Sequence, residues 1–316
     1  MYTQLCKEND IEYALIDAPD PDSIALLSDI LKHKGKVWID HLNNAMIGKY
    51  GELETRFYIA KSEGKIISTI MDTIYSGVGI VSHVYTRPEY RRRGICTKLM
   101  QYMMDDFRNR GGYMLVLDTT FEGTAFWIYI KYGFKPLHYG SEYMTYYNDI
   151  ADIERHFSYS PVRIIRPEWK HWPLHAVLLS VQEIEDIRSI AYDMYSVSNF
   201  ESYLCFKPLW NDNDKQLRFL ESESGAIVGC LYITQKLDYH ILDIFVHPNF
   251  VSYYSILFES IGIPDKTICY VDSKSPNEKH SILMDYGFTS NGKIENITYE
   301  NKEYRYTLYE NGDALC

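Results

Sequence analysis

The segment 82–100 reads SHVYTRPEYRRRGICTKLM, and the rest of the fold can be worked out from it. Residues 83–86 predict a strand, Pro88 predicts a turn, and apolar residues recur at helical spacing from Ile95 onward. A strand, a basic turn and a helix N-terminus form a cradle for phosphate, because the first N–H groups of a helix lack intrahelical partners and carry partial positive charge. Gly94 stands in this turn, where a side chain would keep a phosphate away from the backbone.

The composition is that of a globular protein of about two domains. The chain has 316 residues, of which 46% are hydrophobic and 24% charged. Lys and Arg number 32 against 43 Asp and Glu, which gives a net charge of −11. This acidic balance argues against nucleic acid as the main partner and suits a cationic small molecule.

The cysteines and the N-terminus predict a cytoplasmic protein. No two cysteines form a CxxC or a paired spacing, so we expect reduced thiols and neither a disulfide framework nor a metal site. No basic segment followed by an apolar run opens the chain, and no 18 apolar residues run together. We therefore expect no signal peptide and no membrane partner. The six cysteines are Cys6, Cys96, Cys205, Cys230, Cys269 and Cys316.

The pattern of elements occurs twice along the chain. The first half predicts helices at 23–34, 37–48, 95–110 and 123–132, and strands at 12–17, 55–61, 65–75, 83–86, 113–119 and 142–147. In the second half a strand at 239–246 precedes Pro248 as the first strand precedes Pro88, and SILMDYGF at 281–288 matches the segment 127–134. An internal duplication is predicted, with domains at 1–150 and 151–316.

Two motifs in the first half resemble those of the GNAT (GCN5-related) N-acetyltransferase superfamily. YTRPEYRRRGIC at 85–96 resembles the coenzyme A signature Q/R-x-x-G-x-G/A, and AFWIYIKYGF at 125–134 resembles the helix A-x-x-L-Y-x-K-x-G-F. The resemblance covers about residues 10–148 with motifs intact and 160–310 only in layout. It implies an α/β (α+β) protein of two tandem GNAT-like domains, each a twisted, mostly antiparallel mixed sheet flanked by helices.

The resemblance also implies a binding site for acetyl-CoA as co-substrate. The strand backbone at Val84, Tyr85 and Thr86 would pair with the pantetheine amides, and Tyr129 would protonate the departing thiolate. The pyrophosphate would be wrapped by the loop that contains Arg91, Arg92, Arg93, Gly94, Ile95, Cys96 and Thr97.

The sequence departs from the family pattern at the position of the general base. Ile80 stands where the family commonly has a glutamate, Ser82 stands at the alternative histidine position, and Cys96 replaces the usual Gly or Ala. A base is needed because an amine with a pKa of about 10.4 is almost wholly protonated at pH 7. The candidates are His83, Asp118, Glu122 or a chain of waters.

The second domain lacks the motif residues. Tyr254 falls where Gly94 would lie, and Leu283 takes the place of Tyr129. We therefore expect a degenerate copy that neither binds coenzyme A nor catalyses, and that covers the substrate cleft. The chain as a whole is predicted to transfer acetyl to a primary amine of a cationic small molecule by direct attack. A protein lysine or N-terminal acetyltransferase, a non-catalytic acyl-CoA sensor, and a homodimer stay open.

Overall fold

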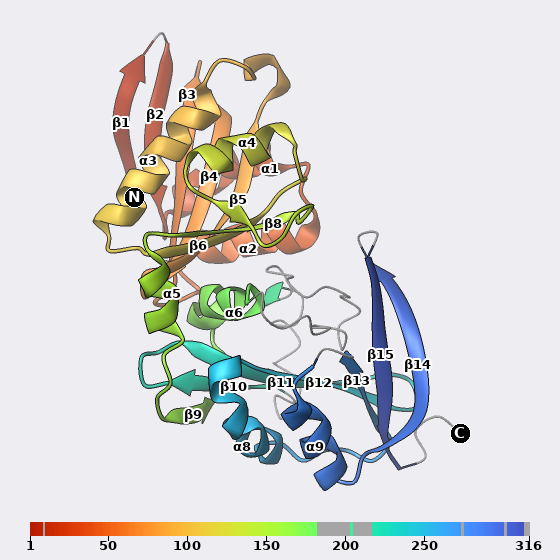
Figure 1. The fold of residues 1–316 in the computed structure, drawn as a ribbon. Coiled ribbons are helices and arrows are strands. Elements are labelled where there is room, and N and C mark those ends of the chain that lie inside the picture. Colours follow the sequence, from red (N-terminus) through yellow and green to blue (C-terminus); the bar gives the residue numbers. More distant parts are fainter. Residues whose placement is uncertain (9, 182–202, 205–216, 273–274, 300–301, 313–316) are drawn as a thin grey trace. The chain divides into compact units, whose positions relative to one another are not determined.

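The computed structural model describes all residues except 9, 182–202, 205–216, 273–274, 300–301 and 313–316 (Figure 1). The chain divides into two compact units. The first comprises Met1–Asp152 and Trp169–Leu174, and the second comprises Ile153–Glu168 and His175–Cys316. The short segment Trp169–Leu174 therefore belongs to the first unit although it follows the expected boundary at residue 150.

The first unit is built on an eight-stranded sheet in the order β1-β2-β3-β4-β5-β6-β8-β7. Only β5 and β6 pair in parallel, and the other neighbours are antiparallel, so the predicted fold class is confirmed. The edge strands β1 and β7 were not predicted, because β1 is exposed along most of its length and shows no apolar alternation. The strands are β1 (Tyr2–Glu8), β2 (Ile11–Asp17), β3 (Glu54–Ser62), β4 (Lys65–Tyr75), β5 (Val78–Thr86), β6 (Met114–Asp118), β7 (Lys135–Pro136) and β8 (Tyr143–Tyr147).

Helices cover both faces of this sheet (Figure 1). Side chains alternate between the faces along a strand, so Met71 of β4 joins the core under one pair of helices and Ile70 joins the core under the other. The α1/α2 face lies under α1 (Ile24–Leu31) and α2 (Lys36–Met46). The α3/α4 face lies under α3 (Ile95–Asn109) and α4 (Thr124–Lys131).

A one-residue bulge interrupts β5 near its end. Tyr85 is paired with Thr69 and Ser82 with Met71, so three steps along β5 correspond to two steps along β4. His83 lies in this bulge with a φ of 50°, in the left-handed region that a side chain rarely adopts. The bulge changes which way the last residues of the strand face.

Strand β5 also loses one of its neighbours before it ends. It pairs with β6 only over Val78, Gly79 and Ile80, whereas its pairing with β4 continues to Thr86. Among the residues that the structure describes, the segment 81–86 thus has a strand on one side only. Its second row of backbone N–H and C=O groups is open to another partner.

Trp172 packs on the α1/α2 face of the first unit, although in the sequence it follows the segment Met1–Asp152 that forms most of that unit. It begins α6 (Trp172–Leu179), its side chain is 0% exposed, and its ring lies edge-on to His41 at a centroid distance of 5.0 Å. We predict that Trp172→Ala lowers the free energy of unfolding by about 3–5 kcal/mol, the usual cost of deleting a buried Trp side chain. Denaturant unfolding measures the change. Trp127→Ala is the control, because Trp127 is 56% exposed, and equal effects of the two substitutions would contradict the packing role.

The second unit contains a seven-stranded sheet in the order β14-β15-β13-β12-β11-β10-β9. Among its described strands, β12 and β13 are the one parallel pair, and the order β11-β12-β13-β15 corresponds to β4-β5-β6-β8 of the first unit. This correspondence is in keeping with the predicted tandem arrangement. The elements are α5 (Ile150–His156), which spans the division between the units, and β9 (Val162–Ile165), β10 (Leu217–Ser222), β11 (Ile227–Gln235), β12 (His240–Val246), α8 (Tyr254–Glu259), β13 (Thr267–Asp272), α9 (Asn277–Asp285), β14 (Thr289–Tyr299) and β15 (Lys302–Asn311).

Three further observations concern only the described part of the chain. Cys6 and Cys96 are free thiols there, Cys230 and Cys269 are buried, and Cys205 and Cys316 lie outside it. None of its helices combines the length and the apolar character that crossing a membrane requires. Its His, Cys, Asp and Glu side chains form no group of three or more that suits a metal ion.

Candidate active site

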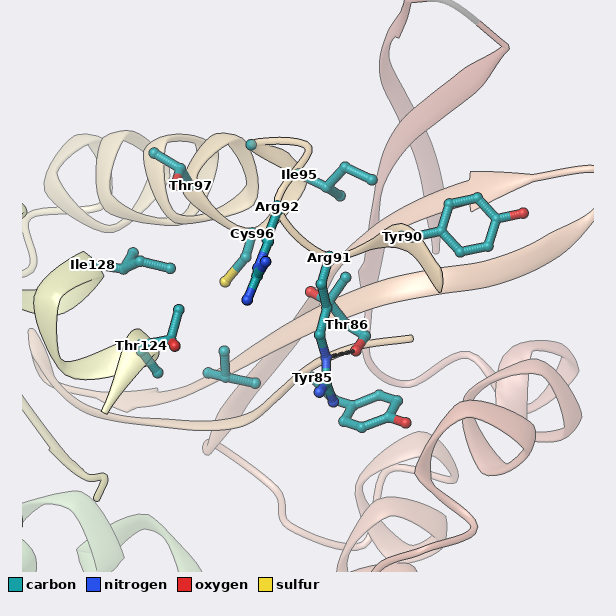
Figure 2. Close-up of a pocket in the computed structure, with 13 residues that line it drawn as sticks. Tyr85, Thr86, Tyr90, Arg91, Arg92, Ile95, Cys96, Thr97, Thr124 and Ile128 are labelled. Atoms are coloured by element: carbon teal, nitrogen blue, oxygen red, sulfur yellow. Dashed lines mark hydrogen bonds between the residues drawn. The ribbon is translucent and has the colours of Figure 1, made fainter. Parts of the chain in front are cut away.

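A cavity of about 460 Å³ opens where β5, the loop 87–94, α3 and α4 meet (Figure 2). It contains nine of the ten residues that the sequence predicted for coenzyme binding, and Arg93 is the one that does not line it. Four lining residues were not predicted from the sequence, although Ala125 belongs to the second motif; the other three are Tyr90, Thr124 and Ile128. The lining residues are Val84, Tyr85, Thr86, Tyr90, Arg91, Arg92, Gly94, Ile95, Cys96, Thr97, Thr124, Ala125 and Ile128.

The loop before α3 presents its backbone to this cavity. Arg92 and Gly94 both have positive φ values, 61° and 76°. A Cβ atom added to Gly94 would meet no atom within 4 Å, so the space beside it is open. Helix α3 starts without a side-chain cap and without an acidic residue in its first turn. Its first N–H groups, with the positive end of the helix dipole, are therefore available to an anion.

Two of the three loop arginines are held by the loop itself. Arg91 donates from Nε to the backbone oxygen of Thr86 at 2.9 Å, and its guanidinium lies 5.8 Å from the centre of the Tyr85 ring. Arg93 donates from Nη2 to the backbone oxygen of Glu89, also at 2.9 Å. The Arg91 contact joins the loop to the end of β5 beside the cavity, whereas the Arg93 contact is exposed and lies within the turn.

Arg92 is the arginine that projects into the cavity. Figure 2 shows its side chain among the residues that line the cavity, and within the described part of the chain its guanidinium has no partner in the loop comparable to those of Arg91 and Arg93. Arg91 also lines the cavity, but its Nε atom is held by the backbone oxygen of Thr86, and Arg93 does not line the cavity. The cavity thus combines arginine side chains with the N–H groups of a helix start.

Tyr129 lies behind the wall of the cavity. It stands on α4, where Ala125 and Ile128 line the cavity, but its own side chain is buried in the α3/α4 core next to Phe134. Burial raises the pKa of the Tyr129 hydroxyl well above its ordinary value, and the nearby Cys96 adds to this shift. The hydroxyl is therefore protonated throughout the neutral pH range and can donate a proton or a hydrogen bond.

Cys96 and Asp118 both influence the pKa of Tyr129. Cys96 lines the cavity, and burial raises the pKa of its thiol to about 11, so the sulfur is uncharged at neutral pH. Asp118 is the exposed last residue of β6, and its charge also raises the pKa of Tyr129. Neither Asp118 nor Tyr129 lines the cavity directly.

His83 lies on the other side of β5 from the cavity. Its ring is 3% exposed and contacts Trp38 of α2 edge-on, with the two centroids 5.2 Å apart. Burial lowers the pKa of His83 well below its ordinary value, and the neighbouring His41, Lys34 and His33 lower it further. His83 is therefore neutral, and the structure brings it together with α2 residues and not with Tyr129.

His41 was missed from the sequence. It occurs within VWIDHLNNAM, where a histidine on the apolar face of a helix is indistinguishable from an ordinary core position. Ile80 has the environment of a core residue as well, being buried and paired with Thr73 on one side and Val116 on the other. An apolar side chain thus stands at the strand position where a glutamate base would be expected from the resemblance.

Comparisons with known proteins bear on the same region. Residues 24–134 match the family model described as Acetyltransferase (GNAT) family, and no curated protein matches the chain. Solved structures that resemble it include PaiA N-acetyltransferase from Thermoplasma acidophilum in complex with coenzyme A, at 16% identity and a TM-score of 0.33, over 42% of this chain and 98% of that one.

Two further solved structures are similar to this chain over a comparable share of its length. A GNAT family acetyltransferase from Elizabethkingia anophelis with acetyl-CoA bound has 18% identity and a TM-score of 0.32, over 44% of this chain and 99% of that one. The ribosomal-protein-S18-alanine N-acetyltransferase from Escherichia coli has 14% identity and a TM-score of 0.33, over 48% of this chain and 96% of that one. Within the first unit, residues 24–134, which include the loop and the residues that line the cavity, are thus similar to the GNAT family of acetyltransferases.

Proposed function

We propose that this protein is an acetyl-CoA-dependent N-acetyltransferase that acts on a primary amine. The observation that carries the proposal is the cavity in which Arg92, the open side of Gly94 and the start of α3 face the unpaired edge of β5. A diphosphate suits Arg92, Gly94 and the start of α3, because it is anionic and accepts several N–H hydrogen bonds at once. The amide groups of a pantetheine arm suit the unpaired edge of β5, because they can continue the hydrogen-bond ladder of a strand.

The residues present thus fit acetyl-CoA as a co-substrate. The loop around Arg92 and Gly94 would hold the pyrophosphate, and the backbone of Val84, Tyr85 and Thr86 would hold the pantetheine. The 460 Å³ of the cavity is enough to enclose part of such a ligand while leaving the rest in solvent. The coenzyme supplies the activated acetyl group, and the chain supplies its position.

The reaction is direct transfer without a covalent enzyme intermediate. The neutral amine attacks the thioester carbonyl, the C–S bond breaks, and the departing thiolate takes a proton from Tyr129. The amine nitrogen loses a proton as the amide forms, and this proton restores the Tyr129 hydroxyl through solvent or a base. Proximity of the two reactants and donors on the carbonyl oxygen supply the rest of the rate gain.

The identity of the base is also a proposal. Asp118 is the candidate whose charge acts on Tyr129, and we propose it as the base for that reason. His83 and Glu122 are the other candidates from the sequence. His83 is a weak proton acceptor in its buried position, because its pKa is held well below the ordinary value.

The proposed acceptor is a cationic small molecule, in line with the net charge of −11. One observation favours a second function: Ile80 puts an apolar side chain where a carboxylate base was sought, which suits a non-catalytic acyl-CoA sensor. Calorimetry with acetyl-CoA, combined with a screen of amines by release of free coenzyme A, separates the two. Binding with release supports the enzyme, binding without release over the whole panel supports the sensor, and absence of binding overturns both.

Arg92 provides a prediction about coenzyme affinity. We expect Arg92→Gln to weaken coenzyme A binding about 10- to 100-fold, the value of one charge-assisted hydrogen bond, and to reduce the dependence of binding on salt. Arg93→Gln is the matched control, since Arg93 lies in the same loop, carries the same charge and does not line the cavity. Isothermal titration at two salt concentrations measures both variants, and equal losses would show that only the net charge of the loop matters.

A further inference from the structure

Two buried histidines lie next to each other on the α1/α2 face of the sheet. His41 of α2 is 2% exposed, His83 of β5 is 3% exposed, and their rings are roughly parallel with centroids 6.1 Å apart. Within the described part of the chain, none of the four ring nitrogens has a hydrogen-bond partner, and the same holds for the buried Oγ atom of Ser82. Five polar atoms without partners thus occur at two adjacent positions of β5 and on the helix that packs against it.

Such a group of atoms is costly in a protein that has no use for it. A buried donor or acceptor without a partner costs about 1–3 kcal/mol, and native structures retain few of them. Burial lowers the pKa of His41 to about 3 and that of His83 well below normal, so both rings are neutral. A neutral imidazole has one N–H donor and one nitrogen acceptor. The complementary group must therefore both accept and donate hydrogen bonds, and a hydroxyl does both.

The surroundings of the pair are aromatic. Trp38 lies edge-on to His83 at 5.2 Å, Tyr50 stacks on His41 at 5.3 Å, and Phe57 stacks on His83 at 6.2 Å, each distance joining two ring centroids. Aromatic faces favour C–H groups and flat apolar surfaces. Hydroxyls on an apolar frame would satisfy the nitrogens and the rings together.

The charges near the pair are unfavourable for a polycation. The imidazole of His41, the ammonium of Lys34 and the imidazole of His33 all lower the pKa of His83. Asp40 of α2 is an acid whose charge reaches Tyr50, and it forms an ion pair with Lys36. Among the described residues that act on these two histidines, none is a carboxylate that could receive a second ammonium group.

The pair is also next to the coenzyme cavity along the chain. His83 immediately precedes Val84, the first residue of β5 that lines the cavity, and the bulge places these two side chains on opposite sides of the strand. We propose that His41 and His83 form the hydroxyl-binding part of the acceptor site, so that the acceptor is a hydroxylated amine of the amino-sugar kind and not a polyamine. This inference rests on the proposed function and narrows its substrate class.

The test compares acceptors that differ in hydroxyl content. Coenzyme A release is measured with glucosamine, cyclohexylamine and putrescine, because the first two share an amine on a six-membered ring and differ in hydroxyls. We expect the wild type to prefer glucosamine over cyclohexylamine by roughly 100-fold in kcat/KM, because a site with hydrogen-bonding groups rejects an analogue that leaves them unpaired. His41→Phe should reduce this ratio about tenfold, and His41→Gln, which keeps a donor and an acceptor, should restore most of it.

A binding measurement separates this inference from the proposed function. Glucosamine is titrated into the full chain saturated with coenzyme A, in the wild type and in His41→Phe. Binding that His41→Phe weakens, without turnover of any amine, would overturn the proposed function and support the hydroxyl site. Three outcomes would each overturn the hydroxyl site and leave the histidines as partners of buried water. In the first, His41→Phe leaves the glucosamine-to-cyclohexylamine ratio of kcat/KM unchanged. In the second, the wild type prefers putrescine over glucosamine, and in the third it neither binds nor acetylates glucosamine.

Discussion

Replacing Gly94 with tyrosine is expected to weaken coenzyme A binding by on the order of 100-fold or more, because two or more charge-assisted hydrogen bonds to the pyrophosphate would be lost. Tyrosine is the residue that the second domain carries at the corresponding position, Tyr254, where the side chain is buried at the start of α8. At Gly94 a side chain would enter the open space of the cavity and separate the ligand from the first N–H groups of α3. Isothermal titration with coenzyme A measures the loss.

The left-handed conformation of Gly94 requires a matched control. A tyrosine there costs about 1–2 kcal/mol in stability because its φ is positive, whatever happens to the ligand. Gly111 has a φ of 77°, no atom within 4 Å of an added Cβ, and a position beyond the opposite end of α3. Gly111→Tyr should therefore show the same loss of stability and retain coenzyme affinity. Retained affinity in Gly94→Tyr would show that the pyrophosphate lies elsewhere.

Removing the Tyr129 hydroxyl is expected to lower kcat by about 100-fold or more, the range for a general acid, with coenzyme affinity unchanged. The ring stays in the α3/α4 core in Tyr129→Phe, so the packing with Phe134 is retained. Because burial holds the pKa of this hydroxyl above its ordinary value, the loss should be the same across the neutral pH range. Steady-state kinetics and coenzyme titration measure the two effects separately.

Tyr146→Phe is the control for the loss of a hydroxyl in the same core. Tyr146 belongs to the same cluster and donates to Asn148 Oδ1 at 2.7 Å, on the side of β8. The same hydroxyl accepts from Arg108 Nε at 3.1 Å, so its removal should cost about 1–3 kcal/mol in stability, the usual range for two hydrogen bonds, and leave kcat alone. Unchanged kcat in Tyr129→Phe would remove the acid role and point to water as the proton source.

The sequence by itself determined the elements of the first unit and the loop that binds the coenzyme in our proposal. Strands β3, β4 and β6 and the four helices were predicted within a few residues, because apolar periodicity and turn residues act over short distances. The residues of the loop were identified because they are contiguous, from Arg91 to Thr97. Strand β1 was missed, since an exposed edge strand needs no apolar face and leaves no pattern to read.

Only the tertiary structure decided what lies on each side of β5. The side to which the His83 side chain points depends on a bulge, which arises from a shift in the register between β4 and β5. The register of two strands cannot be read from the sequence of one of them. Its neighbour His41 is about forty positions away, and Trp172, which covers His41, lies beyond the expected domain boundary. Contacts between residues so distant in sequence form only when the sheet and its helices pack, which is why the coenzyme loop could be read from the sequence and the histidine pair could not.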